Sequence, residues 1–167
     1  MLIAQISDCH IRDHEGWFGR LVDTTETLGL VVEHLLALEP APDVILATGD
    51  LTDDGTPAQY AILRDVLAPI AERIVPLPGN HDEGPVFRLA FADLLPADTA
   101  VDHCSYVVDR HPVRLVGLDT SLPGRHDGLF DADREAWLEE ALSADDRPTL
   151  VFTHFPPFDT GLAFMDQ

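Results

Sequence analysis

The chain has 167 residues, 46% of them hydrophobic, which fits one domain with a buried core, and no segment approaches the roughly 20 continuous apolar residues of a membrane-spanning helix. Its 30 acidic residues outnumber ten Arg, there is no Lys, and the formal net charge of -20 excludes nucleic-acid polymers and anionic membranes as partners by repulsion. Met1 leads directly into an apolar segment without the basic start of a secretory signal, so we expect a cytoplasmic location.

The first half of the chain predicts a βαβαβ unit. Apolar strands are expected over residues 2–7, 43–50 and 73–78, the first of them buried, and two amphipathic helices separate them. The helix over residues 56–70 opens with a Thr-Pro pair typical of an N-cap and a first helical turn. Short apolar strands separated by such helices indicate a parallel sheet covered on both faces. The helix over residues 23–40 places these apolar residues on one face: Leu28, Val31, Val32, Leu35 and Leu36.

The second half of the chain predicts a different kind of sheet. A third helix is expected over residues 86–95. The short link between the apolar segments 105–109 and 113–119 indicates an antiparallel hairpin. A fourth helix, over residues 131–143 with an aspartate as its N-cap, leads to a last strand over residues 149–154. The predicted fold class is therefore α/β.

Polar side chains that can bind metal follow the carboxyl ends of the predicted strands. In an open α/β sheet these ends meet in one crevice, which is the usual ligand site. Asp8 and His10 are two residues apart, so an extended backbone would direct both side chains to the same ion. Gly49 and Gly79 precede two further candidates, where a tight turn needs backbone freedom. The complete set is Asp8, His10, Asp50, Asn80, His81 and His154.

Each of these residues alone has a simpler interpretation. An Asp after Gly is usually a turn former, and an isolated His at a strand end is more often a hydrogen-bonded structural residue. Together, carboxylate, amide and imidazole groups form a mixed oxygen and nitrogen donor set that suits Mn, Fe or Zn, and Asp50 could bridge two ions. Bound metal would also offset the negative charge of the chain for an anionic ligand. Asp53 and Asp54, in contrast, are expected to be solvated turn residues.

Four motifs carry a family resemblance. The segments "DCH" from Asp8, "GDLTDDG" from Gly49, "GNHD" from Gly79 and "THFPP" from Thr153 resemble the successive signatures of the calcineurin-like metallophosphoesterases. The segment "LDTSLPGRHDGLFDADREAWLEEAL" is similar to the branch that contains cyclic-nucleotide and glycerophosphodiester phosphodiesterases. The resemblance implies an α/β/β/α sandwich with a binuclear site for Mn, Fe or Zn. The implied ligands are Asp8 and His10 for the first ion, Asn80 and His154 for the second, and Asp50 as the bridge.

The reaction that the resemblance implies is hydrolysis of a small organic phosphodiester, a cyclic nucleotide or a glycerophosphodiester, by a hydroxide that bridges the two metal ions. His81 would stabilise the developing charge or protonate the leaving alkoxide, and Asp82 could orient it. Two alternatives stay open. One is a phosphomonoesterase or nuclease of the same fold, and the other is a metal- or nucleotide-binding fragment without catalysis.

One motif of the family is missing from the sequence. The Gly-His-x-His segment that supplies one further ligand to each metal ion does not occur in the 167 residues, and no other His stands in that arrangement. We therefore expect residues 1–167 to be the N-terminal, incomplete part of a metallophosphoesterase domain that lacks the C-terminal part of the second sheet. A natural short form is the alternative. Unpaired strand edges and uncovered apolar faces would favour a homodimer or association with the missing part.

Overall fold

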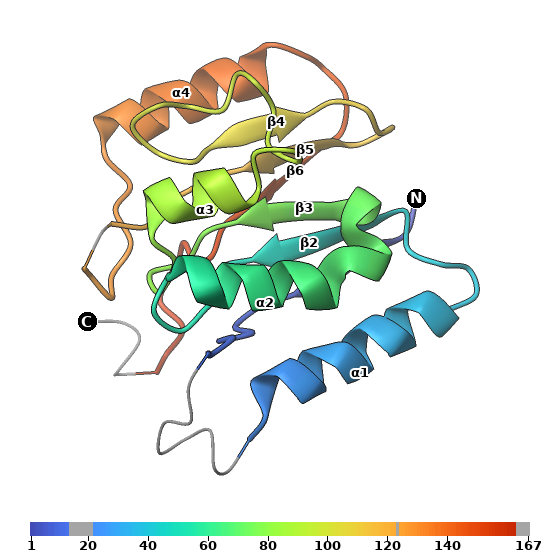
Figure 1. Cartoon of the computed structure of the whole chain (residues 1–167). Helices are drawn as coiled ribbons and strands as arrows, with labels where there is room; N and C mark the ends of the chain where they lie inside the picture. The colour runs from blue at the N-terminus through green and yellow to red at the C-terminus, as the bar shows by residue number, and fades with distance from the viewer. Residues whose placement is uncertain (14–21, 123, 163–167) are drawn as a thin grey trace.

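Two three-stranded sheets form the centre of the molecule. The computed structural model describes residues 1–13, 22–122 and 124–162. The sheets lie face to face, and helices cover the outer side of each (Figure 1). This is the layered α/β arrangement that the sequence predicts.

The first sheet is parallel and has the strand order β1-β2-β3. β1 (Ile3–Ile6) pairs with β2 (Val44–Thr48), which also pairs with β3 (Ile74–Leu77). Every residue of β2 and β3 is buried, as expected for apolar strands covered on both faces. The prediction of a buried first strand is wrong in part, because β1 lies at the edge of this sheet and Gln5 is exposed.

The helix α1 (Thr24–Ala37) packs on the outer face of the first sheet (Figure 1). Its N-cap is Asp23, whose carboxylate accepts a hydrogen bond from the backbone N–H of Glu26. Leu36 was predicted on the apolar face, but its side chain is 44% exposed, because it follows the buried Leu35 by about 100° around the helix. The buried residues of α1 are Leu28, Val32 and Leu35.

The second helix, α2 (Pro57–Leu67), begins as predicted. Thr56 is its N-cap and accepts a hydrogen bond from the backbone N–H of Gln59. The predicted continuation of the helix to residue 70 is wrong, since a 3₁₀ helix, η2 (Ala68–Arg73), takes over. The physical reason is Pro69, which has no N–H to continue the α-helical hydrogen bonds.

The third helix, α3 (Gly84–Ala90), is shorter than predicted. The backbone N–H groups of Leu94 and Leu95 both bond to the carbonyl of Phe91, so the chain turns where the prediction continues the helix. Phe91 packs edge-on against Tyr60 of α2, with ring centroids 6.1 Å apart. This contact fixes the chain that follows β3 against the outer helices.

The second sheet has the order β4-β5-β6. β4 (Tyr106–Val108) and β5 (Arg114–Gly117) form the predicted antiparallel hairpin, and β6 (Thr149–Phe152) runs parallel to β5. The crossover between β5 and β6 contains α4 (Ala132–Ser143), which covers the outer side of this sheet and has the predicted N-cap, Asp131 (Figure 1).

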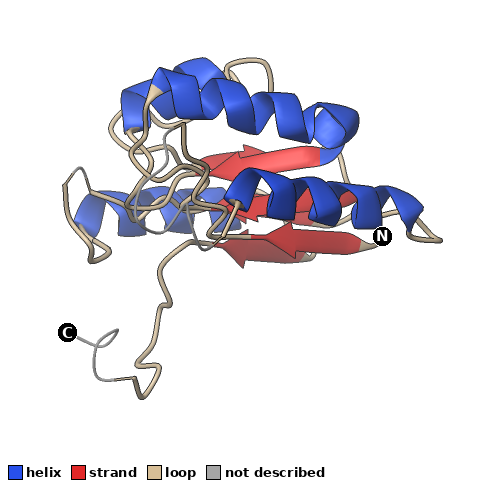
Figure 2. Ribbon diagram, turned by 60° about the horizontal axis from the view of Figure 1, so that its bottom comes forward, coloured by secondary structure: helices blue, strands red, loops and turns tan. Residues whose placement is uncertain are grey.

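The faces of the two sheets that meet form one apolar core. Val44, Leu46, Val75 and Leu77 of the first sheet pack against residues of the second, namely Tyr106, Val108, Leu115 and Phe152. The last part of the described chain, before residue 162, runs away from both sheets (Figure 2). Among the described residues, no helix has the length and apolar character needed to cross a membrane.

Candidate metal centre and active site

The loops that follow β1 and β2 are joined by backbone hydrogen bonds, and side-chain hydrogen bonds of Asp50 and Asp82 join the loop after β3 to them. The N–H of Asp8 donates to the carbonyl of Gly49 over 3.0 Å, and the N–H of His10 donates to the carbonyl of Asp50 over 2.9 Å. A parallel bridge between Ile11 and Thr52 continues this pairing. The carboxyl ends of the parallel strands therefore bring the polar residues of separate loops together.

Three residues of these loops have an unusual backbone. Asp8, His10 and Asp50 have φ values of 56°, 43° and 51°, and they are the non-glycine residues with positive φ in the described ranges 1–13, 22–122 and 124–162. The left-handed region costs of the order of 1–3 kcal/mol for such residues, and strain of this kind gathers at functional sites. All three are predicted metal ligands, but the expected extended backbone at Asp8 and His10 is wrong, because both residues adopt the left-handed conformation.

The carboxylate of Asp50 lies between two histidines. Its Oδ2 is 3.7 Å from Nε2 of His10, and its Oδ1 is 3.5 Å from Nε2 of His154. One ligand atom from each of Asp8, His10 and Asp50 can be chosen so that all three lie within 4.8 Å of one another. Two ligands bonded to one ion at about 2.1 Å are themselves about 3.0–3.4 Å apart, so the two distances from Asp50 to the histidines are close to what an ion requires, whereas a gap of 4.8 Å would have to shorten. Each oxygen of Asp50 faces a different candidate site.

His154 is held so that one ring nitrogen stays available. Its Nδ1 is 2.9 Å from the carbonyl oxygen of Thr48, which places a proton on Nδ1. The neutral ring therefore has its lone pair on Nε2, toward Asp50, whereas a protonated ring donates from Nε2 to the Asp50 carboxylate. Gly49, with φ of 87°, has the backbone freedom that its turn was predicted to need, and a Cβ there would also lie 2.4 Å from Nδ1 of His154. Position 79 needs a glycine because of close contact rather than backbone freedom: a Cβ at this position would lie 2.3 Å from Oδ1 of Asp50.

Asp53 contacts His10, in the loop after β1, and His81, in the loop after β3. Its carboxylate accepts two hydrogen bonds from Arg12, of 2.8 and 3.0 Å, and lies 3.2 Å from Nδ1 of His10. Its backbone carbonyl accepts a hydrogen bond of 2.7 Å from Nδ1 of His81. The prediction that Asp53 is a solvated turn residue is therefore wrong, whereas Asp54 is exposed as expected. No local pattern signals this role, because residues 10–12 and 53 meet only through the pairing of two loops.

Asp82 does not orient His81, contrary to the sequence prediction. Its carboxylate is buried and accepts hydrogen bonds from backbone N–H groups of its own loop and of the loop after β2. It also accepts one from the hydroxyl of Tyr60, at 2.7 Å. Burial raises the pKa of Asp82, and these donors oppose that effect. The residue therefore joins the loops after β2 and β3 to α2. Its other donors are the N–H groups of Gly79, Leu51 and Thr52 and the hydroxyl of Thr52.

Charge pairing sets the protonation of two candidate ligands. Burial acts to raise the pKa of Asp50, but the hydrogen bonds from the His154 ring and the His81 backbone outweigh it, and the pKa is lowered. Burial acts to lower the pKa of His154, but Asp50 and the carbonyl of Thr48 outweigh it, and this pKa is raised. The site therefore favours an ionised Asp50, which is the form that binds metal.

His126, which the sequence does not single out as a site residue, lies beside the site. Nδ1 of His126 is 3.2 Å from the amide Nδ2 of Asn80, and the His126 ring centroid is 5.9 Å from that of His81. On its other side, the His81 ring meets the His10 ring edge-on, with centroids 4.8 Å apart. The only sequence signal was the position of His126 inside the segment that resembles the phosphodiesterase branch.

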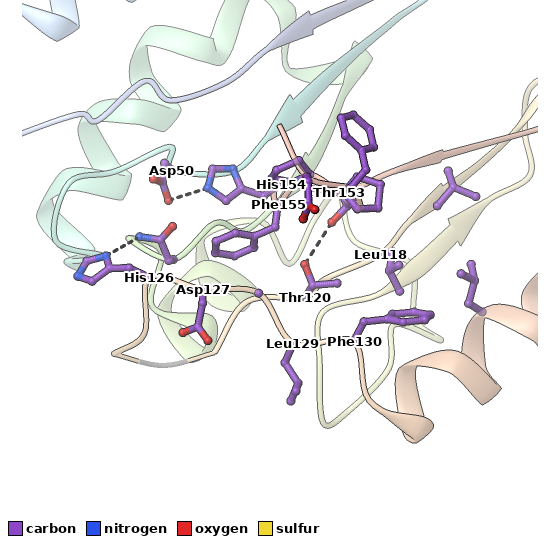
Figure 3. A pocket seen from close by; sticks show the side chains of 18 of the residues that line it. Asp50, Leu118, Thr120, His126, Asp127, Leu129, Phe130, Thr153, His154 and Phe155 are labelled. Carbon is purple, nitrogen blue, oxygen red and sulfur yellow. Dashed lines mark hydrogen bonds and ion pairs between the residues drawn. The ribbon is translucent and has the colours of Figure 1, made fainter. Parts of the chain in front are cut away.

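A cavity of about 1300 Å³ opens beside these residues. One part of its wall is polar and contains Asp8, Asp50, Asn80 and His154. The other part is apolar and comes from β6, α4 and the loops that follow β5 and β6, as Figure 3 shows for Leu118, Leu129, Phe130 and Phe155. The arrangement can accept a ligand with a charged group at one end and a less polar group at the other.

The donor set fits metal ions. Carboxylate oxygens, imidazole nitrogens and an amide oxygen suit Mn, Fe or Zn. In the described part of the chain, Nδ1 of His10 is a buried ring nitrogen without an aligned hydrogen-bond partner, although Asp53 is near it. A ring that binds an ion through Nε2 usually turns its other nitrogen toward a carboxylate in this way.

A comparison with protein families agrees with this geometry. The model of the calcineurin-like phosphoesterases matches residues 1–166. The chain belongs to the calcineurin-like phosphoesterase family. This family uses a dinuclear metal centre, and the described residues contain groups that could hold metal ions.

Curated relatives of this chain are named as phosphodiesterases. The chain is 35% identical to the glycerophosphodiester phosphodiesterase GpdQ of Enterobacter lignolyticus over 99% of its own length and 60% of the relative's. It is 32% identical to the probable glycerophosphodiester phosphodiesterase of Arcobacter nitrofigilis, over 99% and 61% of the two chains. It is also 35% identical to the 3',5'-cyclic adenosine monophosphate phosphodiesterase CpdA of Pseudomonas aeruginosa, over 99% and 59%. The chain thus spans about 60% of the length of these relatives.

A solved structure shows the same fold. The purple acid phosphatase PPD1 of yellow lupin (Lupinus luteus) superposes with a TM-score of 0.63 over 90% of this chain and 29% of the plant protein, at 16% identity. At this identity the likeness concerns the fold alone. It confirms the metallophosphoesterase-like layers that the sequence predicts.

Proposed function

We propose that this phosphoesterase hydrolyses small organic phosphodiesters in a metal-dependent reaction. The observation that carries the proposal is the meeting of Asp8, His10 and Asp50, each with strained backbone, within reach of one ion and beside a cavity. The names of the curated relatives support a glycerophosphodiester or a cyclic nucleotide as substrate. The net charge of -20 also argues for a local cation, because the substrate is an anion.

We assign the metal ligands by position. Asp8 and His10 would hold the first ion, and Asn80 and His154 would hold the second. Asp50 would serve both ions, since its two oxygens face different histidines. The ions are Mn, Fe or Zn, and when bound they would polarise phosphate oxygens and lower the pKa of water toward 7.

His81 is the proposed catalytic residue. Its Nδ1 is hydrogen-bonded to the carbonyl of Asp53, so the ring is fixed and Nε2 is the nitrogen that exchanges a proton with a ligand. Its backbone N–H donates to Oδ1 of Asp50 over 2.9 Å, which ties the catalytic ring to the proposed bridging carboxylate. When protonated, His81 would stabilise the negative charge that develops on the phosphoryl oxygens or deliver a proton to the leaving alkoxide.

The proposal extends to partners and location. The acidic surface disfavours nucleic-acid polymers, and we expect the protein to act on small molecules in the cytoplasm. β6 supports association with a second copy or with further chain of the same protein, because it has one strand partner among the described residues and its Leu150 is 37% exposed.

A hydrolysis assay tests the proposal. We expect the 167-residue chain to hydrolyse bis(p-nitrophenyl) phosphate when Mn²⁺ is added and to lose this activity with EDTA. The phosphomonoester p-nitrophenyl phosphate, measured in parallel, separates a diesterase from a monoesterase. Cyclic AMP and a glycerophosphodiester then define the substrate class. Equal activity with and without metal would contradict the proposal.

One observation favours metal binding without turnover as a second candidate. The sequence holds no Gly-His-x-His segment, so each ion has fewer ligands from these residues than the family resemblance implies. Mn²⁺ binding measured by calorimetry, together with no hydrolysis of either substrate, would select this candidate.

A further inference from the structure

The orientation of the Asn80 amide decides whether this residue can bind metal. An amide binds a cation through its oxygen, because the nitrogen carries two protons and has no lone pair to offer. The two ends have nearly the same shape, so only their hydrogen-bond partners determine which end faces the ion. Asn80 lines the cavity together with Asp50 and His154.

His126 supplies the partner that selects this orientation. Its Nδ1 lies 3.2 Å from the amide Nδ2 of Asn80. In this contact Asn80 Nδ2 donates and the ring nitrogen accepts, so the proton of a neutral His126 ring is on Nε2. With Nδ2 engaged outside the proposed metal site, the Oδ1 of Asn80 is the end left for an ion.

The loop that carries His126 is fixed by several contacts to the strand ends. The N–H of Leu129 donates to the carbonyl of Thr120 over 2.8 Å. Gly128 lies so close to Phe155 that a Cβ at this position would be 3.0 Å from the ring. Phe155 follows His154, so the loop and the proposed ligand after β6 are positioned together.

We propose that His126 is a positioning residue for the second metal site: by accepting a hydrogen bond from Asn80, it turns the amide oxygen toward the ion. The inference rests on the proposed function, since it assumes that Asn80 is a ligand. Removing a residue that orients a ligand typically lowers metal affinity by about 10–100-fold.

Manganese binding to the whole chain, followed by calorimetry, tests this role without an activity assay. We expect His126→Ala to weaken the second, weaker Mn²⁺ binding step by about 10–100-fold, as loss of an orienting partner does. His126→Gln should recover most of the affinity, because its amide oxygen can accept from Asn80. His34→Ala, which removes an exposed histidine of α1, is the matched control and should bind as the unmutated chain does.

A double-mutant cycle separates positioning from a general structural effect. If His126 acts through Asn80, then His126→Ala should have no further effect in a chain that already carries Asn80→Ala. Two independent, additive losses would overturn the inference, and so would unchanged Mn²⁺ binding by His126→Ala. An unmutated chain that binds no Mn²⁺ would contradict the proposed function and this inference together, whereas normal binding insensitive to His126 contradicts the inference alone.

Discussion

The loops of the first sheet and the outer edge of the second sheet are held in different ways. In the first region, backbone pairing and the buried carboxylate of Asp82 lock together the loops after β1, β2 and β3. In the second region, β6 has one strand partner among the described residues, and Leu150 and Val151 are exposed. Metal chemistry requires fixed ligands, and the first region supplies them with its own contacts.

The two sheets therefore contribute different parts of the proposed site. The first sheet carries Asp8, His10, Asp50 and Asn80, all on rigid loops at strand ends. The second sheet adds His154 at the end of β6 and the apolar wall of the cavity. We therefore expect substitutions in the first region to alter metal binding and stability strongly, and substitutions at the edge of β6 to alter them little.

The largest effect is expected from Asp50→Ala. Both proposed metal sites lose a ligand at once, because the oxygens of Asp50 face His10 and His154 separately. Hydrolysis of bis(p-nitrophenyl) phosphate should fall to background, and metal analysis should show loss of both ions. His34→Ala serves as the control. If the variant kept both ions, Asp50 would not be the bridging ligand.

His81→Ala should separate catalysis from metal binding within the same loops. Its ring bonds to the Asp53 carbonyl and is not assigned as a ligand, so metal content should stay nearly unchanged. Turnover should fall by about a hundredfold or more, as expected for loss of a general acid. Metal loss equal to that of Asp50→Ala would instead identify His81 as a ligand.

Asp82→Ala tests how much the contacts between the loops of the first sheet contribute to the free energy of unfolding. The substitution leaves several buried donors without an acceptor, each worth about 1–3 kcal/mol, so the free energy of unfolding should fall by at least about 3 kcal/mol. Asp82→Asn keeps one acceptor oxygen and should lose less. Urea denaturation followed by circular dichroism provides the measurement.

Leu150→Thr on β6 provides the opposite case. Because this side chain is 37% exposed in the single chain, the free energy of unfolding should change by no more than about 0.5 kcal/mol in the same urea experiment, carried out at a protein concentration at which sedimentation shows a monomer. A loss as large as that of Asp82→Ala would show that the edge of β6 is covered in solution, and sedimentation would then reveal the association.

The smallest expected effect is a dependence of stability on pH in the metal-free chain. The pKa of His154 is raised, so its contribution is complete below its ordinary value of 6.5 and is lost as the pH rises through the folded value. The pKa of Asp50 is lowered, so its contribution is present above its ordinary value of 3.8 and is lost as the pH falls through the folded value. Stability should therefore be highest between these limits.

A matched variant checks the cause of this pH dependence. His154→Gln has no titrating ring, so the loss of unfolding free energy above pH 6.5 should disappear while the acid side remains. Urea titrations in EDTA at pH 5.5, 7 and 8.5 would measure both chains. An unchanged alkaline slope in the variant would assign the effect to another group.

The sequence predicts the strands and the meeting of the site residues, because these follow from apolar periodicity and from the geometry of parallel strand ends. The layers of the sandwich were implied by the family resemblance instead. Asp8, Asp50 and His154 are examples, since each directly follows an apolar segment. Their roles as ligands stay a prediction. The ends of α2 and α3 were less predictable, because a proline and a turn at Phe91 compete with helical periodicity.

Local sequence patterns could not predict which residues hold the proposed ligands in place. Asp53 meets His10 only because two loops pair, and Asp82 contacts Tyr60 only because α2 packs below the site. His126 comes from a loop 46 residues away from Asn80 in the chain. Such contacts depend on how distant loops fold against one another, and one sequence contains no periodic signal for them.

Anomalous diffraction at the manganese edge tests the central claim most directly. Crystals of the 167-residue chain equilibrated with Mn²⁺ should show an ion bound by Asp8, His10 and Asp50, with weaker or partial occupancy beside Asn80 and His154. This expectation follows from the ligands that the chain itself provides. A manganese peak elsewhere on the acidic surface, with none at these three residues, would contradict the account.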